Sequence, residues 1–209
     1  MKKRQDKSAV QAQAILTAQK VMIDFIGSII KLTHAEKELL TPILKYRQVK
    51  KHEFILQAGE VCKDVFFITK GLLRMYYVDS KGEEINYRFA DDNNFGVDYQ
   101  SFLLQKPSRF NWQAMQDSEV LALSHADIQR VYNASPAWNT FGRLIAERVY
   151  LQMNERVEML LFMTPEERYN LLLETQPQLF EQISQFHLSS YLGVKPESLS
   201  RLRKRLMKR

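Results

Sequence analysis

Residues 183–206 read ISQFHLSSYLGVKPESLSRLRKRL, and this stretch has the spacing of two short helices that cross at a tight turn. Gly193 lies where the chain must turn sharply, and the small Ser189 lets the two helices approach each other. Pro196 suits the first position of the second helix, because its missing N–H would have no partner there. The stretch therefore predicts a helix-turn-helix. The apolar contact shared by its helices is expected from Leu188, Leu192, Val194, Leu199 and Leu202.

The second helix of this motif is predicted to bury Leu199, Leu202 and Leu206, which turns its polar side chains outward. Arginine can bond guanine edges, glutamate can accept from the cytosine amino group, and lysine or serine can contact phosphates or bases. In the alternative reading the helix is merely solvated, and Glu197 pairs with Arg201 one turn later. The residues expected to contact DNA are Lys195, Glu197, Ser198, Arg201, Lys204 and Arg205. Glu197 and Arg201 are the candidates for reading bases.

The net charge of +6 is concentrated at the C-terminal end of the chain. Residues 194–209 hold seven basic residues against one acid, and the residues before them hold 23 of each. A neutral body with a basic end is typical of a polyanion-binding module attached to another domain. Double-stranded DNA is therefore the expected partner.

The middle of the chain, between residues 48 and 124, has short β-type runs separated by turn signals such as Gly59 and Gly71. Closely spaced strands with glycine turns favour an antiparallel barrel or jelly roll. Together with the flanking helical patterns they predict an α+β fold with an N-terminal antiparallel β-roll. The expected strands are Phe54–Leu56, Val65–Ile68, Leu72–Val78, Ile85–Phe89, Trp112–Met115 and Val120–Leu123.

Helical patterns flank these runs on both sides. Residues 9–46 are predicted to be helical, with Thr33 capping a helix three residues before Glu36. A long helix follows Pro136 and continues to about Met163, and Thr164 caps another that ends near Thr175. The long helix carries more apolar residues than one face buries, so a symmetric homodimer is expected, although packing on its own barrel alone is the alternative.

These patterns divide the chain into four parts. Residues 1–20 are expected to form an N-terminal extension, and residues 21–136 a sensor domain. Residues 137–163 would form the dimerisation helix, and residues 164–209 the helix-turn-helix domain.

Composition excludes several classes of protein. No stretch approaches the roughly 18 apolar residues of a membrane span, and no secretory signal follows the basic start, so a cytoplasmic location is expected. Cys62 is the single cysteine, which excludes an internal disulfide and favours a buried, inert thiol. No cofactor is expected, because the four histidines, His34, His52, His125 and His187, lack metal-ligand spacing.

The order of barrel, long helix, short helices and terminal helix-turn-helix resembles the Crp/Fnr superfamily of regulators from about Ile23 onward. The most specific stretches are Gly59-Glu60, residues 66–71 (FFITKG) and residues 197–201 (ESLSR). In that family an Arg-Glu-x-x-x-Arg pattern reads bases, and Pro196 here replaces its first arginine. The resemblance implies a transcription regulator that binds DNA as a homodimer and contacts RNA polymerase, with an operator sequence different from the usual one.

Family members that bind cyclic nucleotides contact the ribose through a Phe-Gly-Glu stretch and the phosphate through an Arg-Ser pair. Val97 stands here where that glutamate belongs, Ser108 stands for the arginine, and a Thr-Ser pair of the long helix falls at Leu151-Gln152. The resemblance therefore implies an effector other than cyclic AMP. The residues that could line a modified pocket are Arg88, Asp98, Gln100 and Arg109, although surface charges on strands and loops are the alternative reading.

Two other classes of function are alternatives to a transcription regulator. An enzyme on a cupin-like barrel would need clustered His and carboxylate ligands, but no His-x-His occurs, and Glu83-Glu84 and Glu166-Glu167 fall at a turn and a helix start. The protein is therefore not expected to be an enzyme. A ligand-binding regulatory protein acting through protein contacts is the second alternative, and the basic end of the chain opposes it.

Overall fold

The computed structural model describes residues 2–207, with side chains from residue 9 onward. The chain divides into two compact units. The sheet unit comprises residues 1–75 and 89–144, and the C-terminal unit comprises residues 76–88 and 145–209. Lys208 and Arg209, which contribute to the basic end of the sequence, lie outside the described residues.

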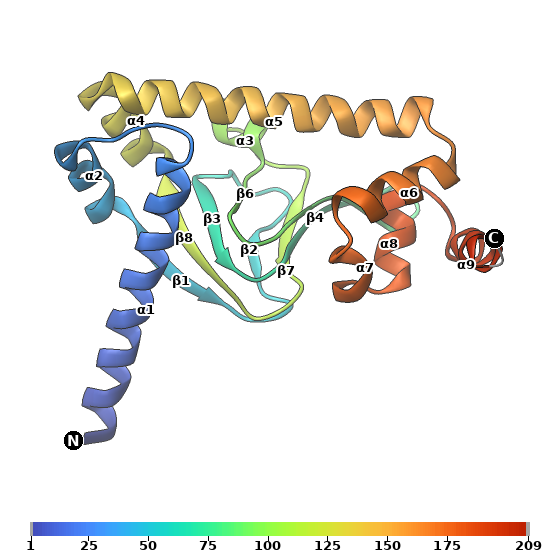
Figure 1. The fold of residues 1–209 in the computed structure, drawn as a ribbon, viewed down its shortest axis with the longest axis horizontal. Helices are drawn as coiled ribbons and strands as arrows, with labels where there is room; N and C mark the ends of the chain where they lie inside the picture. Colours follow the sequence, from blue (N-terminus) through green and yellow to red (C-terminus); the bar gives the residue numbers. More distant parts are fainter. Residues whose placement is uncertain (1, 208–209) are drawn as a thin grey trace. The chain divides into compact units, whose positions relative to one another are not determined.

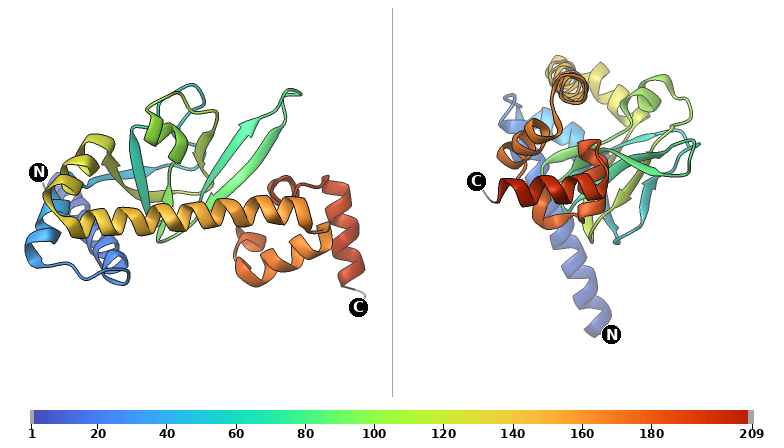
Figure 2. Two further views of the ribbon diagram at one scale, coloured as in Figure 1. Left: turned by 90° about the horizontal axis from the view of Figure 1, so that it is seen from above. Right: turned by 90° about the vertical axis from the view of Figure 1, so that its right-hand side faces the viewer.

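The helices follow the predicted order along the chain (Figure 1). They are α1 (Lys2–Gly27), α2 (His34–Leu40), the 3₁₀ turn η1 (Thr41–Ile43), α3 (Tyr99–Leu104), α4 (His125–Ala134), α5 (Pro136–Phe162), α6 (Pro165–Thr175), α7 (Leu179–Gln182), α8 (Gln185–Leu192) and α9 (Pro196–Leu206). Figure 2 shows α5 as one unbroken helix, which confirms the predicted long helix.

The strands form two four-stranded sheets, with the orders β1-β8-β3-β6 and β2-β7-β4-β5. Strand β1 pairs with β8, β3 pairs with both β8 and β6, and β2 pairs with β7, each in antiparallel orientation. Antiparallel sheets of this kind confirm the predicted jelly-roll-like arrangement. The strands are β1 (Lys45–Val49), β2 (Phe54–Leu56), β3 (Asp64–Lys70), β4 (Leu73–Val78), β5 (Glu84–Ala90), β6 (Asn94–Gly96), β7 (Asn111–Ala114) and β8 (Ser118–Ser124).

Aromatic packing holds the core of the sheet unit together. Phe67 on β3 is fully buried, and its ring centroid lies 5.2 Å from those of both Phe25 on α1 and Phe95 on β6. Rings at this spacing add favourable edge and tilted contacts to the burial of apolar area. Helix α1 is thus fixed to the sheet through its C-terminal half.

Local capping explains where two of the predicted helices begin. Thr33 and Glu36 cap α2 reciprocally, and Thr164 and Glu167 do the same for α6. The hydrogen bond from the Thr164 backbone N–H lowers the pKa of Glu167, with the Thr164 hydroxyl as a further cause. The predicted helical pattern up to Tyr46 was wrong at its end, because Lys45 and Tyr46 belong to strand β1 and pair with Ala122 and Leu121 of β8.

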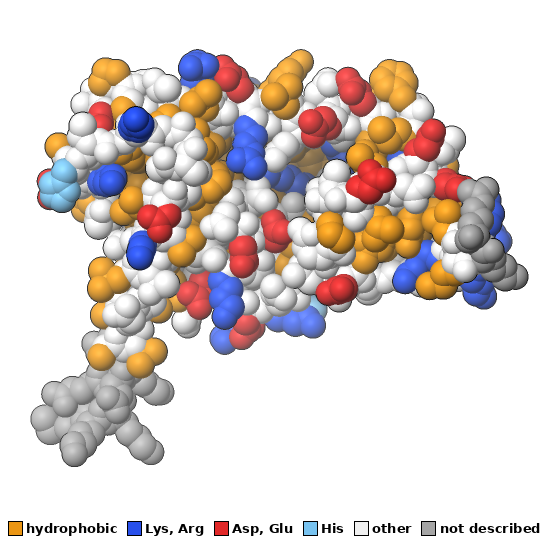
Figure 3. Space-filling view, viewed as in Figure 1, with side chains coloured by type: hydrophobic (Ala, Val, Ile, Leu, Met, Phe, Trp, Pro, Cys, Tyr) orange, Lys and Arg blue, Asp and Glu red, His pale blue; other side chains and the backbone are white. Residues whose placement is uncertain are grey.

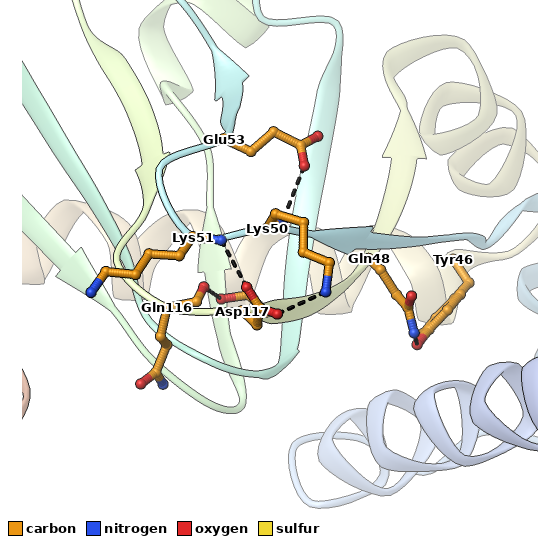
Figure 4. Close-up of polar contacts among 8 residues, drawn as sticks. Tyr46, Gln48, Lys50, Lys51, Glu53, Gln116 and Asp117 are labelled. Atoms are coloured by element: carbon orange, nitrogen blue, oxygen red, sulfur yellow. Dashed lines mark hydrogen bonds and ion pairs between the residues drawn. The ribbon is translucent and has the colours of Figure 1, made fainter.

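A polar cluster closes one end of the sheet unit at the turns that follow β1 and β7. In Figure 4 the Asp117 carboxylate lies between Lys50 and Lys51, accepting from Lys50 Nζ at 2.7 Å and from the Lys51 N–H at 2.9 Å. Glu53 accepts from the Lys50 N–H at 2.9 Å. The Lys50 hydrogen bond lowers the pKa of Asp117. Because these groups satisfy one another and the turn backbone, the cluster has a structural role.

The described residues contain neither a membrane-spanning helix nor a metal-binding cluster. None of the helices within residues 2–207 combines the length and hydropathy needed to cross a bilayer. In the same part of the chain, His, Cys, Asp and Glu side chains form no group of three that could hold a metal ion.

Cys62 lies in the core of the sheet unit, which confirms the expected buried thiol. The residue is 2% exposed, and its Sγ contacts the Asp64 carbonyl oxygen at 3.3 Å. Burial raises the pKa of the thiol to about 11. At pH 8 the thiolate, which is the reactive form, is therefore scarce in the folded protein.

We predict that native Cys62 reacts with a disulfide reagent at pH 8 roughly a hundredfold more slowly than the same thiol in the unfolded chain, because an ordinary thiol has a pKa of about 8.5. The rate in the native state should rise as the pH approaches 11. Spectrophotometric titration with and without guanidinium measures both rates. Equal rates in the two states would contradict the assignment.

Candidate nucleic-acid interface

Helices α8 and α9 are joined by a turn that depends on Gly193. This residue has φ +66°, in the left-handed region, and its N–H caps α8 by donating to the carbonyl oxygens of Ser189 and Ser190. A Cβ at this position would lie 3.2 Å from Leu160 Cδ2 and 3.3 Å from Arg168 Nη1. The left-handed conformation favours glycine at this turn, as the sequence predicted, and a Cβ would press on the ends of these two side chains.

The two helices share the apolar contact expected from the sequence. Leu192 and Leu199 are fully buried, and Leu188 and Leu202 nearly so. Ser189 is 1% exposed, which agrees with its expected role as a small residue at the crossing. These contacts fix which face of α9 points away from the protein.

The outward face of α9 carries most of the side chains predicted to contact DNA. Lys195, Glu197, Arg201 and Lys204 are all exposed, and Figure 3 shows Lys and Arg side chains gathered at this end of the chain. Arg201 Nη2 donates to Ser198 Oγ at 3.3 Å. No ion pair joins Glu197 and Arg201 within the described residues, so their charged ends are not engaged with each other.

Arg205 differs from the other predicted residues of α9. Its Nη2 lies 2.5 Å from Glu166 Oε2 on α6, and its side chain is 59% exposed. No local pattern predicts this pair, since the two residues are 39 positions apart. The pair connects α9 to α6 through a partly exposed contact, which contributes about 0 to 1 kcal/mol at most.

The hairpin formed by the end of β4 and the start of β5 contacts α8 within the C-terminal unit. Asn86 on β5 is 1% exposed, and its N–H donates to Ser190 Oγ at 2.9 Å. The Ser190 hydroxyl donates in turn to the Glu84 carbonyl oxygen at 3.1 Å, and Asn86 Nδ2 donates to the His187 carbonyl oxygen at 3.2 Å. An asparagine in a predicted strand was the only signal of this contact, because asparagine is depleted in strands.

The four candidate ligand-binding residues are not brought together by any hydrogen bond or ion pair of the described residues. Arg88 is half-buried and donates from Nη2 to Gln152 Oε1 at 3.1 Å, and burial lowers its pKa. Asp98 is buried and caps α3 by accepting from the Ser101 N–H. Gln100 and Arg109 are exposed. Their ligand-binding role stays a prediction.

The positions that depart from the cyclic-nucleotide pattern do not present phosphate- or ribose-binding side chains. Val97 is buried, and Ser108 is 4% exposed with its hydroxyl bonded to both backbone groups of Phe110. Leu151 is 57% exposed, while Gln152 accepts from Arg88. A hydroxyl committed to its own turn cannot take the place of an arginine fork on a phosphate.

Comparison with known proteins agrees with this architecture. Residues 46–135 match the family model of the cyclic nucleotide-binding domain. The solved structure of FixK2 from Bradyrhizobium japonicum is similar, with a TM-score of 0.67 and 18% identity, over 79% of this chain and 85% of that one. A putative Crp/Fnr-family transcriptional regulator from Eubacterium rectale gives a TM-score of 0.66 at 17% identity, over 84% of each chain.

The catabolite activator protein of Thermus thermophilus is also similar, with a TM-score of 0.55 and 18% identity, over 88% of this chain and 87% of that one. No curated protein matches the sequence. These findings confirm the fold that the resemblance implied: residues 46–135 form a cyclic nucleotide-binding-like domain, and the chain shares the fold of these solved structures, which include a putative Crp/Fnr-family regulator.

Proposed function

We propose that this protein is a sequence-specific DNA-binding transcription regulator that acts as a homodimer under the control of an effector other than cyclic AMP. The observation that carries the proposal is the two-sided character of α9. Its apolar face is buried against α8, and its opposite face presents exposed basic side chains and Glu197. A helix of this kind, preceded by a short helix and a tight turn, is the recognition element of a helix-turn-helix.

The placement of Glu197 and Arg201 supports base reading. The two residues are four positions apart, so they lie on the same side of α9 within its first two turns. In a helix-turn-helix the N-terminal part of the recognition helix contacts the base edges. Lys195 and Lys204 flank this pair and suit phosphate contacts. Pro196 has no side-chain donor, so specificity would rest on fewer base contacts than in the family pattern.

An exposed apolar stripe on α5 supports the homodimer. Tyr150, Val157 and Leu161 are 68%, 49% and 71% exposed, and with Asn154 they repeat at intervals of three and four residues. This is the spacing of a coiled-coil seam, in which a single polar Asn specifies register. A twofold pair of such helices would place two α9 helices on half-sites about 34 Å apart in successive major grooves.

The proposed regulator would also have an effector, a contact with RNA polymerase and a cellular location. The burial of Val97 and the bonding of the Ser108 hydroxyl to the Phe110 backbone support an effector other than cyclic AMP. Contact with RNA polymerase stays a prediction that follows from the resemblance, and a cytoplasmic location stays a prediction that follows from the composition of the sequence. The domain boundaries predicted at residues 20, 136 and 163 likewise stay predictions.

We expect Arg201→Ala to weaken binding to a preferred DNA site by about 1 to 3 kcal/mol, because one base contact is lost. The site is first obtained by selection from a random pool, and affinity is then measured by fluorescence anisotropy at fixed salt. Lys51→Ala, which removes one exposed charge from a turn of the sheet unit, is the control and should bind unchanged. A pool without a preferred sequence, or an Arg201 variant that keeps full affinity, would overturn DNA reading and favour a regulator acting through protein contacts.

A second prediction tests the seam on α5. Leu161→Asp should convert the dimer to a monomer, because it places a charge in the apolar contact between the two helices. The fold of the single chain should tolerate the change, since Leu161 is exposed there. Light scattering after size-exclusion chromatography measures the mass. Leu103→Asp, at an equally apolar and 55% exposed position on α3, should remain dimeric. If the Leu161 variant also stays dimeric, the seam is elsewhere.

A further inference from the structure

The C-terminal unit holds two arginines that are withdrawn from solvent without a counter-charge. Arg168 on α6 is 8% exposed, and its Nε has no hydrogen-bond partner. Arg156 on α5 is half-buried, and its Nε is likewise buried without a partner. Within residues 9–207 neither arginine has a carboxylate at ion-pair distance. Buried charges in proteins are ordinarily paired, so two unpaired arginines withdrawn from solvent are unusual.

The surroundings of Arg156 hold its guanidinium in one place. Its Nη2 donates to the Tyr191 carbonyl oxygen at 2.5 Å, and its Cζ lies 4.1 Å from the centroid of the Tyr191 ring. Burial lowers the pKa of Arg156, the neighbouring tyrosines oppose this, and Arg168 adds to it as a like charge. Tyr191 lies two residues from Gly193, against which Arg168 packs, so the two like charges lie near each other in a partly desolvated region.

Arg168 is fixed from the other side of the same region. Its Nη1 lies 3.3 Å from where a Cβ of Gly193 would be, so the guanidinium packs against the α8–α9 turn. An arginine cannot relieve its charge by losing a proton at any ordinary pH. A water molecule would leave the two positive charges uncompensated. An anion held by the guanidinium Nη groups would compensate them.

We propose that Arg156 and Arg168 form a binding site for a phosphate group, carried either by free inorganic phosphate or by a small phosphate ester. Two guanidinium forks suit the oxygens of a phosphate, whose charge of about −1.5 to −2 near pH 7 balances two arginines, whereas a carboxylate balances one. The site would join α5, α6 and the α8–α9 turn. This inference goes beyond the proposed function, and its test needs no DNA.

The test is thermal unfolding of the full chain in increasing inorganic phosphate, with ionic strength held constant by sodium chloride. The midpoint Tm should rise and saturate, by roughly 3 to 6 °C at ten times Kd. A nucleoside 5′-monophosphate is titrated in parallel. Half-saturation at a much lower concentration of the monophosphate identifies an ester as the ligand, and equal or weaker binding identifies the free ion. A linear, unsaturated rise is a general salt effect and overturns the proposal.

Arg168→Met separates a ligand site from a structural arginine. Since the variant removes one of two repelling charges, its Tm without phosphate should equal or exceed that of the parent, and its phosphate response should be lost. The control is Lys51→Met, which also replaces one basic residue by methionine, and this variant should keep the full phosphate response. A lower Tm without phosphate together with an unchanged phosphate response would overturn the proposal. A parent protein that never responds to phosphate would also overturn it, whether or not that protein is a dimer.

Arg156→Lys keeps the test decisive if the methionine variant does not fold. Lysine retains the charge but loses the planar fork, so the phosphate concentration at half-saturation should increase by about tenfold. An unchanged phosphate titration in this variant would show that Arg156 does not bind the ion.

Discussion

The packing of α8 against α9, which buries Leu192 and Leu199, constrains the rest of the C-terminal unit. For these helices to pack, the chain must reverse within a few residues, and Gly193 makes this turn in a left-handed conformation close to Leu160 and Arg168. Once the leucines are buried, the charged side chains of α9 have one remaining direction, toward solvent. The exposed basic face is therefore a consequence of packing as much as of charge.

Features determined by neighbouring residues could be predicted from the sequence. The capped starts of α2 and α6 each depend on two residues three positions apart, and such pairs are visible in a sequence. The start of β1 could not be predicted in this way. Lys45 and Tyr46 become part of a strand because they pair with β8, more than seventy residues later, and nothing local favours that pairing.

The candidate site divides along the same line. The outward positions of Glu197 and Arg201 follow from helical periodicity and from the positions of Leu199 and Leu202. The pairing of Arg205 with Glu166 and the burial of Arg168 do not, since they depend on how α6 lies against α8 and α9. An arginine on a helix is usually solvated, so the sequence alone favours the wrong environment for Arg168.

The contact between the β4–β5 hairpin and α8 affects how this architecture could be recombined. The chain passes between the two units at three places, after residues 75, 88 and 144, rather than through one linker. A chimaera joined only at residue 144 would therefore bring α8 without the strand that covers it, leaving Ser190 without Glu84 and Asn86. The sheet unit and the C-terminal unit are thus not freely interchangeable modules, because residues 76–88 would have to be inherited together with the C-terminal helices.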